Sequence, residues 1–416
     1  MDVLEITANL DTLIYLAIGV GILMAFGIGA NDFSNSMGPA VGGKVLGLIA
    51  ALVLAAICEF VGAMFFSSNV TETIRTSIID IDQLGDQPAT VFYGMVSALL
   101  AAALWLMIAS AKGWPVSTTH SIIGALVGFG IVGIGFEAVR WGDVANIASS
   151  WIISPLLGGA VAYLIMKSIL VLILQSPRPV EAAQRWGPVY VILAGFTVSL
   201  ALMFKGVTFL AFEVMEPAES LVMALVAGTV ISAMGLFSFL NLDVDEVENA
   251  FYPMILFTVC VMAFAHGAND VANAVGPMAI ALGVLGAAGE GMTEVMTRSQ
   301  MYLIGTVGII LGMALLGHKV LRTVGTGITS LSPCRAFCAT LATAGTVTTA
   351  STMGLPVSTT HILIGAVLGV GLAESPQKVH WPMVRTILIA WLITIPVVGV
   401  LAALIFWLLP VFFTAP

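Results

Sequence analysis

Long apolar runs follow one another along almost the whole chain, and a run of about 20 residues crosses a lipid bilayer as a helix. Charged residues make up only 9% of the 416 positions, whereas a soluble protein carries roughly 25%. We therefore expect an all-α, polytopic membrane protein with about twelve transmembrane elements, since helices satisfy their own backbone groups in lipid. The candidate elements cover residues 13–29, 45–66, 91–109, 121–136, 152–174, 189–204, 221–240, 251–265, 303–316, 336–350, 362–372 and 384–409.

The remaining charged residues and the cysteines exclude several kinds of protein. The 14 Lys and Arg residues are scattered, so the sequence predicts no basic surface for nucleic acid. The four cysteines, at positions 58, 260, 334 and 338, do not make a disulfide framework. Cys334 and Cys338 have no second pair or His nearby to complete a zinc site, so helix packing explains them better.

Two polar motifs each occur twice. GANDFSNSMGP at 29–39 matches GANDVANAVGP at 267–277 at seven of eleven positions, with an offset of 238 (269 minus 31). GWPVSTTHSIIGALVG at 113–128 matches GLPVSTTHILIGAVLG at 354–369 at eleven of sixteen positions, with an offset of 241 (354 minus 113). The near-constant offset indicates that one unit was duplicated, which is typical of transporters with a pseudo-two-fold axis.

The duplication predicts three parts of the chain. The first repeat occupies residues 1–175 and the second occupies residues 253–416. Residues 176–252 link them and contain two extra transmembrane helices. The two copies are inverted if each unit crosses the membrane an odd number of times, a count that the sequence leaves open.

The GAND motif brings carboxylates to membrane depth. Gly29 and Gly267 follow apolar spans directly, and Asn and Asp side chains compete for backbone hydrogen bonds, so we predict a broken helix at each copy. Irregular backbone is tolerated there only where it is buried in protein or lines a cavity. Because an intramembrane carboxylate is costly, Asp32 and Asp270 are candidate functional residues. The alternative is that they only cap a helix at the water interface.

The polar residues of the GAND motif suggest a cation site. Asn and Asp oxygens are hard donors that suit sodium, calcium or magnesium. If helix resumes after the break, spacings of three and four residues place these side chains on one face. The two candidate sets are Asn31, Asp32 and Asn35, and Asn269, Asp270 and Asn273.

The PVSTTH motif predicts an anion site. It places Ser and Thr where the open N–H groups of a helix start await a partner, and such an N-terminus attracts anions. The candidate residues are Ser117, Thr118, Thr119, Ser358, Thr359 and Thr360. Ordinary capping of the helix is one alternative. A remote alternative is an intramembrane hydrolase with Ser117 as nucleophile and His120 as base, for which no third member is evident.

The charge of this arrangement favours cotransport. Two aspartates and an oxyanion together place several negative charges at membrane depth, where uncompensated charge is prohibitive. Neither motif contains Lys or Arg. Mobile cations should therefore bind together with the anion, and the charge argument leaves sodium and protons both open.

The two GAND copies, the two PVSTTH copies and their order together resemble the inorganic phosphate transporter family of sodium- or proton-coupled phosphate symporters. EFVGAMFFSSNVTETIR at 59–75 is also similar to the family, and it adds Glu59 as a third intramembrane acid in the cation set. The resemblance implies that the Asn and Asp residues bind sodium. It further implies that the Ser and Thr residues bind phosphate, with Asp32 and Asp270 shared. GAND in both copies resembles the sodium-coupled branch.

We therefore expect a secondary active transporter for sodium-coupled symport of inorganic phosphate by alternating access. It would be a multi-pass protein of the cell (inner or plasma) membrane, not an enzyme, with no cofactor besides transported sodium. A proton-coupled phosphate symporter and a sulfate symporter remain alternatives. A homo-oligomer is a further open alternative.

Overall fold

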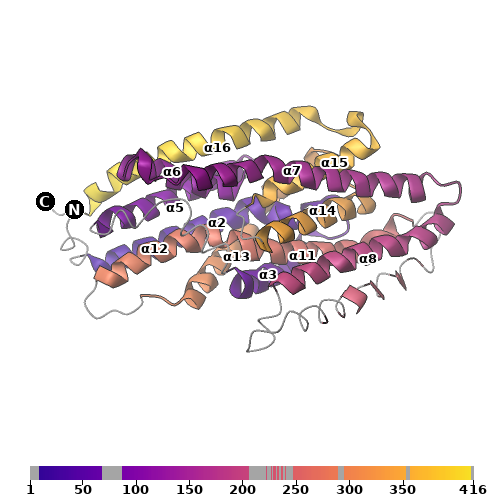
Figure 1. The fold of residues 1–416 in the computed structure, drawn as a ribbon, viewed down its shortest axis with the longest axis horizontal. Helices are drawn as coiled ribbons and strands as arrows, with labels where there is room; N and C mark the ends of the chain where they lie inside the picture. Colours follow the sequence, from indigo (N-terminus) through magenta and orange to yellow (C-terminus); the bar gives the residue numbers. More distant parts are fainter. Residues whose placement is uncertain are drawn as a thin grey trace.

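The computed structural model describes residues 9–67, 87–205, 247–288, 295–352 and 357–413, together with isolated positions between 222 and 239. The described residues form an elongated bundle of α-helices without strands (Figure 1). The helices are α2 (Leu10–Gly42), α3 (Leu48–Phe66), α5 (Pro88–Ala111), α6 (Thr118–Gly133), α7 (Trp141–Ile169), α8 (Pro179–Lys205), α11 (Tyr252–Asp270), α12 (Ala272–Ala288), α13 (Arg298–Arg322), α14 (Pro333–Thr352), α15 (Thr359–Glu374) and α16 (Trp381–Leu408). The described ends of the chain meet, since Asn9 Nδ2 donates to the Phe413 carbonyl at 3.4 Å.

The predicted all-α membrane architecture is confirmed. Seven helical segments of the described residues are long and apolar enough to cross a membrane. Large apolar side chains point outward from α7 and α16, where Leu156 is 68% and Leu392 is 78% exposed, as lipid-facing residues should be. The first predicted extra helix lies within α8, whereas most of the second, at 221–240, falls outside the described residues.

The structure contradicts the predicted break at the first GAND copy. Helix α2 runs without interruption from Leu10 to Gly42 and includes the whole motif from Gly29 to Pro39. The second copy has a one-residue interruption at Val271, whose backbone is itself helical (φ −58°, ψ −28°). The physical reason is that the Asn and Asp side chains bind groups on other elements, so they do not compete for their own backbone.

A larger interruption lies at the first PVSTTH motif, and the described residues Val357 and Ser358 of the second are likewise outside a helix. Helix α5 ends at Ala111 and α6 begins at Thr118, and α14 ends at Thr352 before α15 begins at Thr359. Helices α6 and α15 have 16 residues each, too few to cross a bilayer of about 30 Å. Both therefore begin inside the protein, where their first residues are buried.

Glycines let helices from distant parts of the chain pack backbone to backbone. A Cβ on Gly29 of α2 would collide with the main chain of Ile309 on α13. A Cβ on Gly267 of α11 would collide in the same way with the main chain of Glu59 on α3. The two glycines are 238 residues apart (267 minus 29) and their partners 250 apart (309 minus 59). The same contact is therefore made twice, each time between an early and a late helix.

A second pair of equivalent contacts joins the helices that follow PVSTTH. Gly124 of α6 approaches the main chain of Ile395 on α16, and Gly365 of α15 approaches the main chain of Pro155 on α7. The offsets are 241 (365 minus 124) and 240 (395 minus 155), close to the offset between the two motif copies. Each short helix is thus held by a long helix from the other end of the chain.

Candidate functional site

The two PVSTTH segments start helices as predicted. Ser117 has an extended backbone and its hydroxyl oxygen accepts a hydrogen bond from the His120 main-chain N–H at 3.1 Å. Ser358 accepts from the His361 main-chain N–H at 3.2 Å. Both serines therefore act as N-caps, which satisfies one of the open donors of each helix. Their own hydroxyl protons are not used in these bonds.

Asn31 supports the interrupted backbone before α6. Its side-chain Nδ2 donates to the Trp114 carbonyl at 3.0 Å and to Ser110 Oγ at 3.1 Å. Its Oδ1 accepts from the Val116 main-chain N–H at 3.0 Å. Buried backbone groups outside a helix need such partners, so Asn31 fixes the approach to the helix start.

The first GAND copy contacts the start of α15, more than 320 residues away. Asn35 Nδ2 donates to Thr360 Oγ1 at 2.9 Å and to Thr359 Oγ1 at 3.1 Å. The Thr360 hydroxyl donates to Asp32 at 3.1 Å, and the Thr359 hydroxyl donates to Asp270 at 2.9 Å. Both aspartates and both threonines therefore meet at one buried place.

The second GAND copy makes the reciprocal contact with α6. Asn273 Nδ2 lies 3.5 Å from Thr118 Oγ1, and Asn269 Nδ2 donates to the neighbouring Asp270 at 2.7 Å. The Thr119 hydroxyl reaches across to the main chain just before α15 at 3.4 Å. All of the predicted site residues are buried, and both GAND copies contact the two helix starts.

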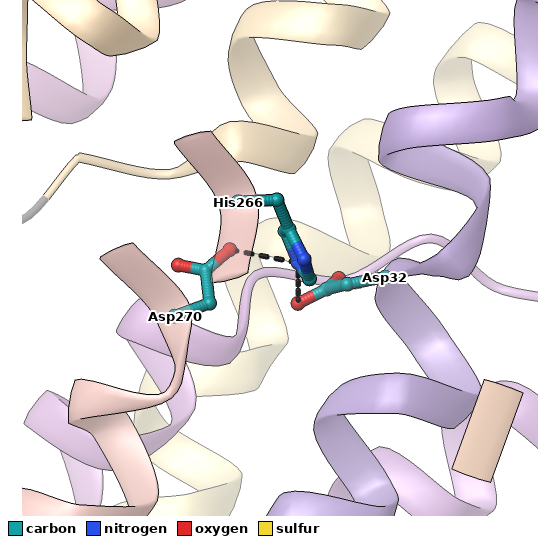
Figure 2. A group of neighbouring side chains, drawn as sticks. All are labelled: Asp32, His266 and Asp270. Carbon is teal, nitrogen blue, oxygen red and sulfur yellow. Dashed lines mark ion pairs between the residues drawn. The ribbon is translucent and has the colours of Figure 1, made fainter. Parts of the chain in front are cut away.

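Three carboxylates gather around one histidine. His266 Nε2 lies 2.9 Å from Asp270 Oδ2 and 3.6 Å from Asp32 Oδ2, as Figure 2 shows. On the other side of the ring, Nδ1 lies 3.2 Å from Glu59 Oε1. All four side chains are fully buried. Helices α2, α3 and α11 each contribute to this cluster.

The cluster has the chemistry of a cation site. Its three acids carry up to three negative charges, of which His266 can balance one at most. Within the described part of the chain, Asp32 Oδ2 and Glu59 Oε2 have no hydrogen-bond partner. The ligand atoms of Asp32, His266 and Asp270 lie within 4.8 Å of one another. Buried carboxylate oxygens without donors suit a hard cation such as sodium.

His266 was not among the residues that we predicted for the site. It stands directly before Gly267 in the second GAND copy, whereas Ile28 stands at the equivalent place in the first. A signal was available, because a histidine within an apolar span and four residues before Asp270 shares one helix face with it. Only the structure shows that its ring also reaches Asp32 and Glu59.

The geometry does not support a Ser–His nucleophile. The Ser117 hydroxyl binds the main-chain nitrogen of His120 and not its ring. Among the described residues, neither ring nitrogen of His120 has a hydrogen-bond partner. The ring packs instead against Trp151, with centroids 3.8 Å apart, and against His361, at 4.2 Å. This histidine pair joins α6 to α15.

Comparisons with known proteins also favour a transporter over a hydrolase. The phosphate transporter family model matches residues 28–402. A protein of Haemophilus influenzae described as a phosphate permease is 38% identical over 414 residues, which cover 96% of this chain and 97% of its own. The chloroplastic inorganic phosphate transporter 2-1 of Arabidopsis thaliana is 37% identical, covering 95% of this chain and 72% of its own. A solved structure named as the sodium-dependent phosphate transporter is 38% identical with a TM-score of 0.84, covering 96% of this chain and 99% of that chain.

Proposed function

The chain belongs to the phosphate transporter family, and we propose that it is a secondary transporter that carries inorganic phosphate across the membrane together with sodium. It is a multi-pass membrane protein and not an enzyme. The observation that carries the proposal is the meeting of Asp32, Asp270 and the threonines of α15 at one buried place. Groups suited to a cation and groups suited to an oxyanion are neighbours there.

Phosphate would bind at the helix starts. The hydroxyls of each STTH segment and the open N–H groups of α6 and α15 are donors, which an oxyanion needs. Because the Ser117 and Ser358 oxygens accept from their own helices, their protons stay available to a phosphate oxygen. The proposed phosphate ligands are Ser117, Thr118, Thr119, Ser358, Thr359 and Thr360, with Asp32 and Asp270 facing them.

Sodium would make phosphate binding possible. The Thr359 and Thr360 hydroxyls each donate a hydrogen bond to one of the two aspartates. A sodium ion at the carboxylates would offset their charge and release these hydroxyls for the anion. The proposed sodium ligands come from Asn31, Asp32, Asn35, Asn269, Asp270, Asn273 and Glu59. Of these, Asn31 also holds the backbone before α6.

The fully buried carboxylates require a conformational change, because an ion cannot reach them in the closed arrangement. Alternating access of two related units, residues 1–175 and 253–416, accounts for such a change. The paired glycine contacts support this division, with residues 176–252 as a linker. In this proposal the site opens to one side of the membrane at a time.

Uptake into liposomes tests the proposal. The purified protein is reconstituted, and radiolabelled phosphate uptake is compared under an inward sodium gradient, an equal potassium gradient and a proton gradient. We expect accumulation above equilibrium with sodium alone, and weak competition by sulfate. Accumulation with protons alone, or equal competition by sulfate, would favour the proton-coupled or sulfate-carrying alternative. Equilibration without accumulation would contradict secondary active transport.

A further inference from the structure

Two free thiols lie on α3 and α11 next to a close contact between the two helices. Cys58 belongs to α3 and Cys260 to α11, two helices that pack against each other, and both side chains are partly exposed. The helix register supports the same contact. Four residues after Cys58, Gly62 packs against the main chain of Phe264, which lies four residues after Cys260. The two helices pack against each other, and α3 lies at the lower side of the bundle in Figure 1.

The equivalent place on the other helix pair confirms the geometry. A Cβ atom placed on Gly308 of α13 would lie 3.1 Å from the main-chain oxygen of Ile22 on α2, so the two helices are in close contact there. Cys260 is 238 residues after Ile22, and Cys58 is 250 residues before Gly308, which are the offsets of the other paired contacts. The chain thus places two thiols at one copy of a close helix contact and none at the other.

We propose that Cys58 and Cys260 are an oxidation site that forms a disulfide between α3 and α11. A hydroperoxide is the oxidant class. One thiolate attacks the terminal peroxide oxygen, the O–O bond breaks, and a sulfenic acid and an alcohol form. The second thiol then attacks this sulfur, an S–S bond forms, and water leaves. Two thiols lose two electrons and two protons, and the peroxide is reduced to alcohol and water.

The surroundings favour this pair over the other two cysteines. Cys58 and Cys260 are partly exposed on the outside of the bundle, so a membrane-permeant oxidant reaches them. Cys334 and Cys338 are buried on one helix, α14. A bond between Cys58 and Cys260 needs the folded structure, because the two lie 202 residues apart (260 minus 58). A disulfide over so long a loop should stabilise the fold by restricting the unfolded chain.

Mass spectrometry of the full-length protein in detergent tests the proposal. After treatment with tert-butyl hydroperoxide, we expect the intact mass to fall by two hydrogens and the free thiols to fall from four to two. Digestion should yield one linked peptide that contains Cys58 and Cys260. The thermal midpoint should rise on oxidation and return to its starting value after dithiothreitol.

Matched variants make the result decisive. Cys58→Ala shortens the side chain towards the glycine of the equivalent place, Gly308, and Cys260→Val introduces a β-branched side chain like that of Ile22, so at least one variant should fold. Either should abolish the linked peptide, whereas Cys334→Ala should retain it. The absence of a linked peptide under conditions that oxidise a control dithiol protein would overturn the proposal, as would a bond between Cys334 and Cys338. A linked peptide with an unchanged thermal midpoint would show that the disulfide does not stabilise the fold.

Discussion

The replacement Asp270→Asn removes one negative charge from the acid cluster and leaves the side-chain shape almost unchanged. Asp270 Oδ2 lies 2.9 Å from His266 Nε2, and the ligand atoms of Asp32, His266 and Asp270 lie within 4.8 Å of one another. A cation among them is about 4 Å or less from the Asp270 carboxylate, where a pair of unit charges interacts by about 4 kcal/mol at an effective dielectric constant of about 20. Since about 1.4 kcal/mol is a factor of ten, sodium affinity should fall by roughly a thousandfold.

The assay is phosphate uptake into proteoliposomes as a function of external sodium. The sodium concentration for half-maximal uptake should move beyond any practical range for Asp270→Asn, so uptake at ordinary sodium concentrations should be lost. Glu137→Gln is the matched control, because it removes one negative charge from an exposed position outside the cluster. This control should keep the wild-type sodium dependence.

A specific result would refute the reasoning. If Asp270→Asn folds, inserts into liposomes and shows the wild-type sodium dependence, then Asp270 does not hold the transported cation. The same measurement on Asp32→Asn checks the other member of the pair. A loss in one variant with no loss in the other would show that a single carboxylate binds sodium.

Three further changes test other parts of the site and fold. Thr360→Val removes the hydroxyl that donates to Asp32 at 3.1 Å and that sodium would release to phosphate, so half-saturation by phosphate should rise about tenfold in uptake assays, as expected for a hydrogen bond to charge worth at least about 1.5 kcal/mol. Gly312→Val forces a side chain into the main chain of α2, so the thermal midpoint in detergent should fall by several degrees. Ser117→Ala should cost about 1 kcal/mol of stability through the lost cap and should raise the half-saturation concentration for phosphate; unchanged phosphate dependence would contradict a role in binding.

The membrane architecture and the site motifs could be predicted because their signals are local. Apolar length gives the spans, and a Ser before an apolar helix gives the start of α6, where Ser117 is the cap. That the helix continues through the first GAND copy could not be predicted in this way. Its helix continues because Asn31 and Asn35 bind residues about 80 and 320 positions away, and those partners come from tertiary packing.

The role of His266 also depended on tertiary packing. The sequence places it on one helix face with Asp270, but its contacts to Asp32 and Glu59 come from two other helices. A helix pattern fixes which side chains share a face and not which other helix covers that face. An ionisable residue inside an apolar span, such as His266, is therefore a candidate site residue in its own right.

The exchange of helix partners between the early and late parts of the chain has a consequence for biogenesis. Helix α2 meets its glycine-packed neighbour α13 only after more than 250 further residues have been synthesised. Until then, Gly29 lacks the Ile309 main chain against which it packs. A ribosome that stalls before α13 should therefore leave an inserted but loosely packed chain that proteases recognise. Two fragments separated within residues 176–252, the proposed linker, should be stable only when a cell makes both.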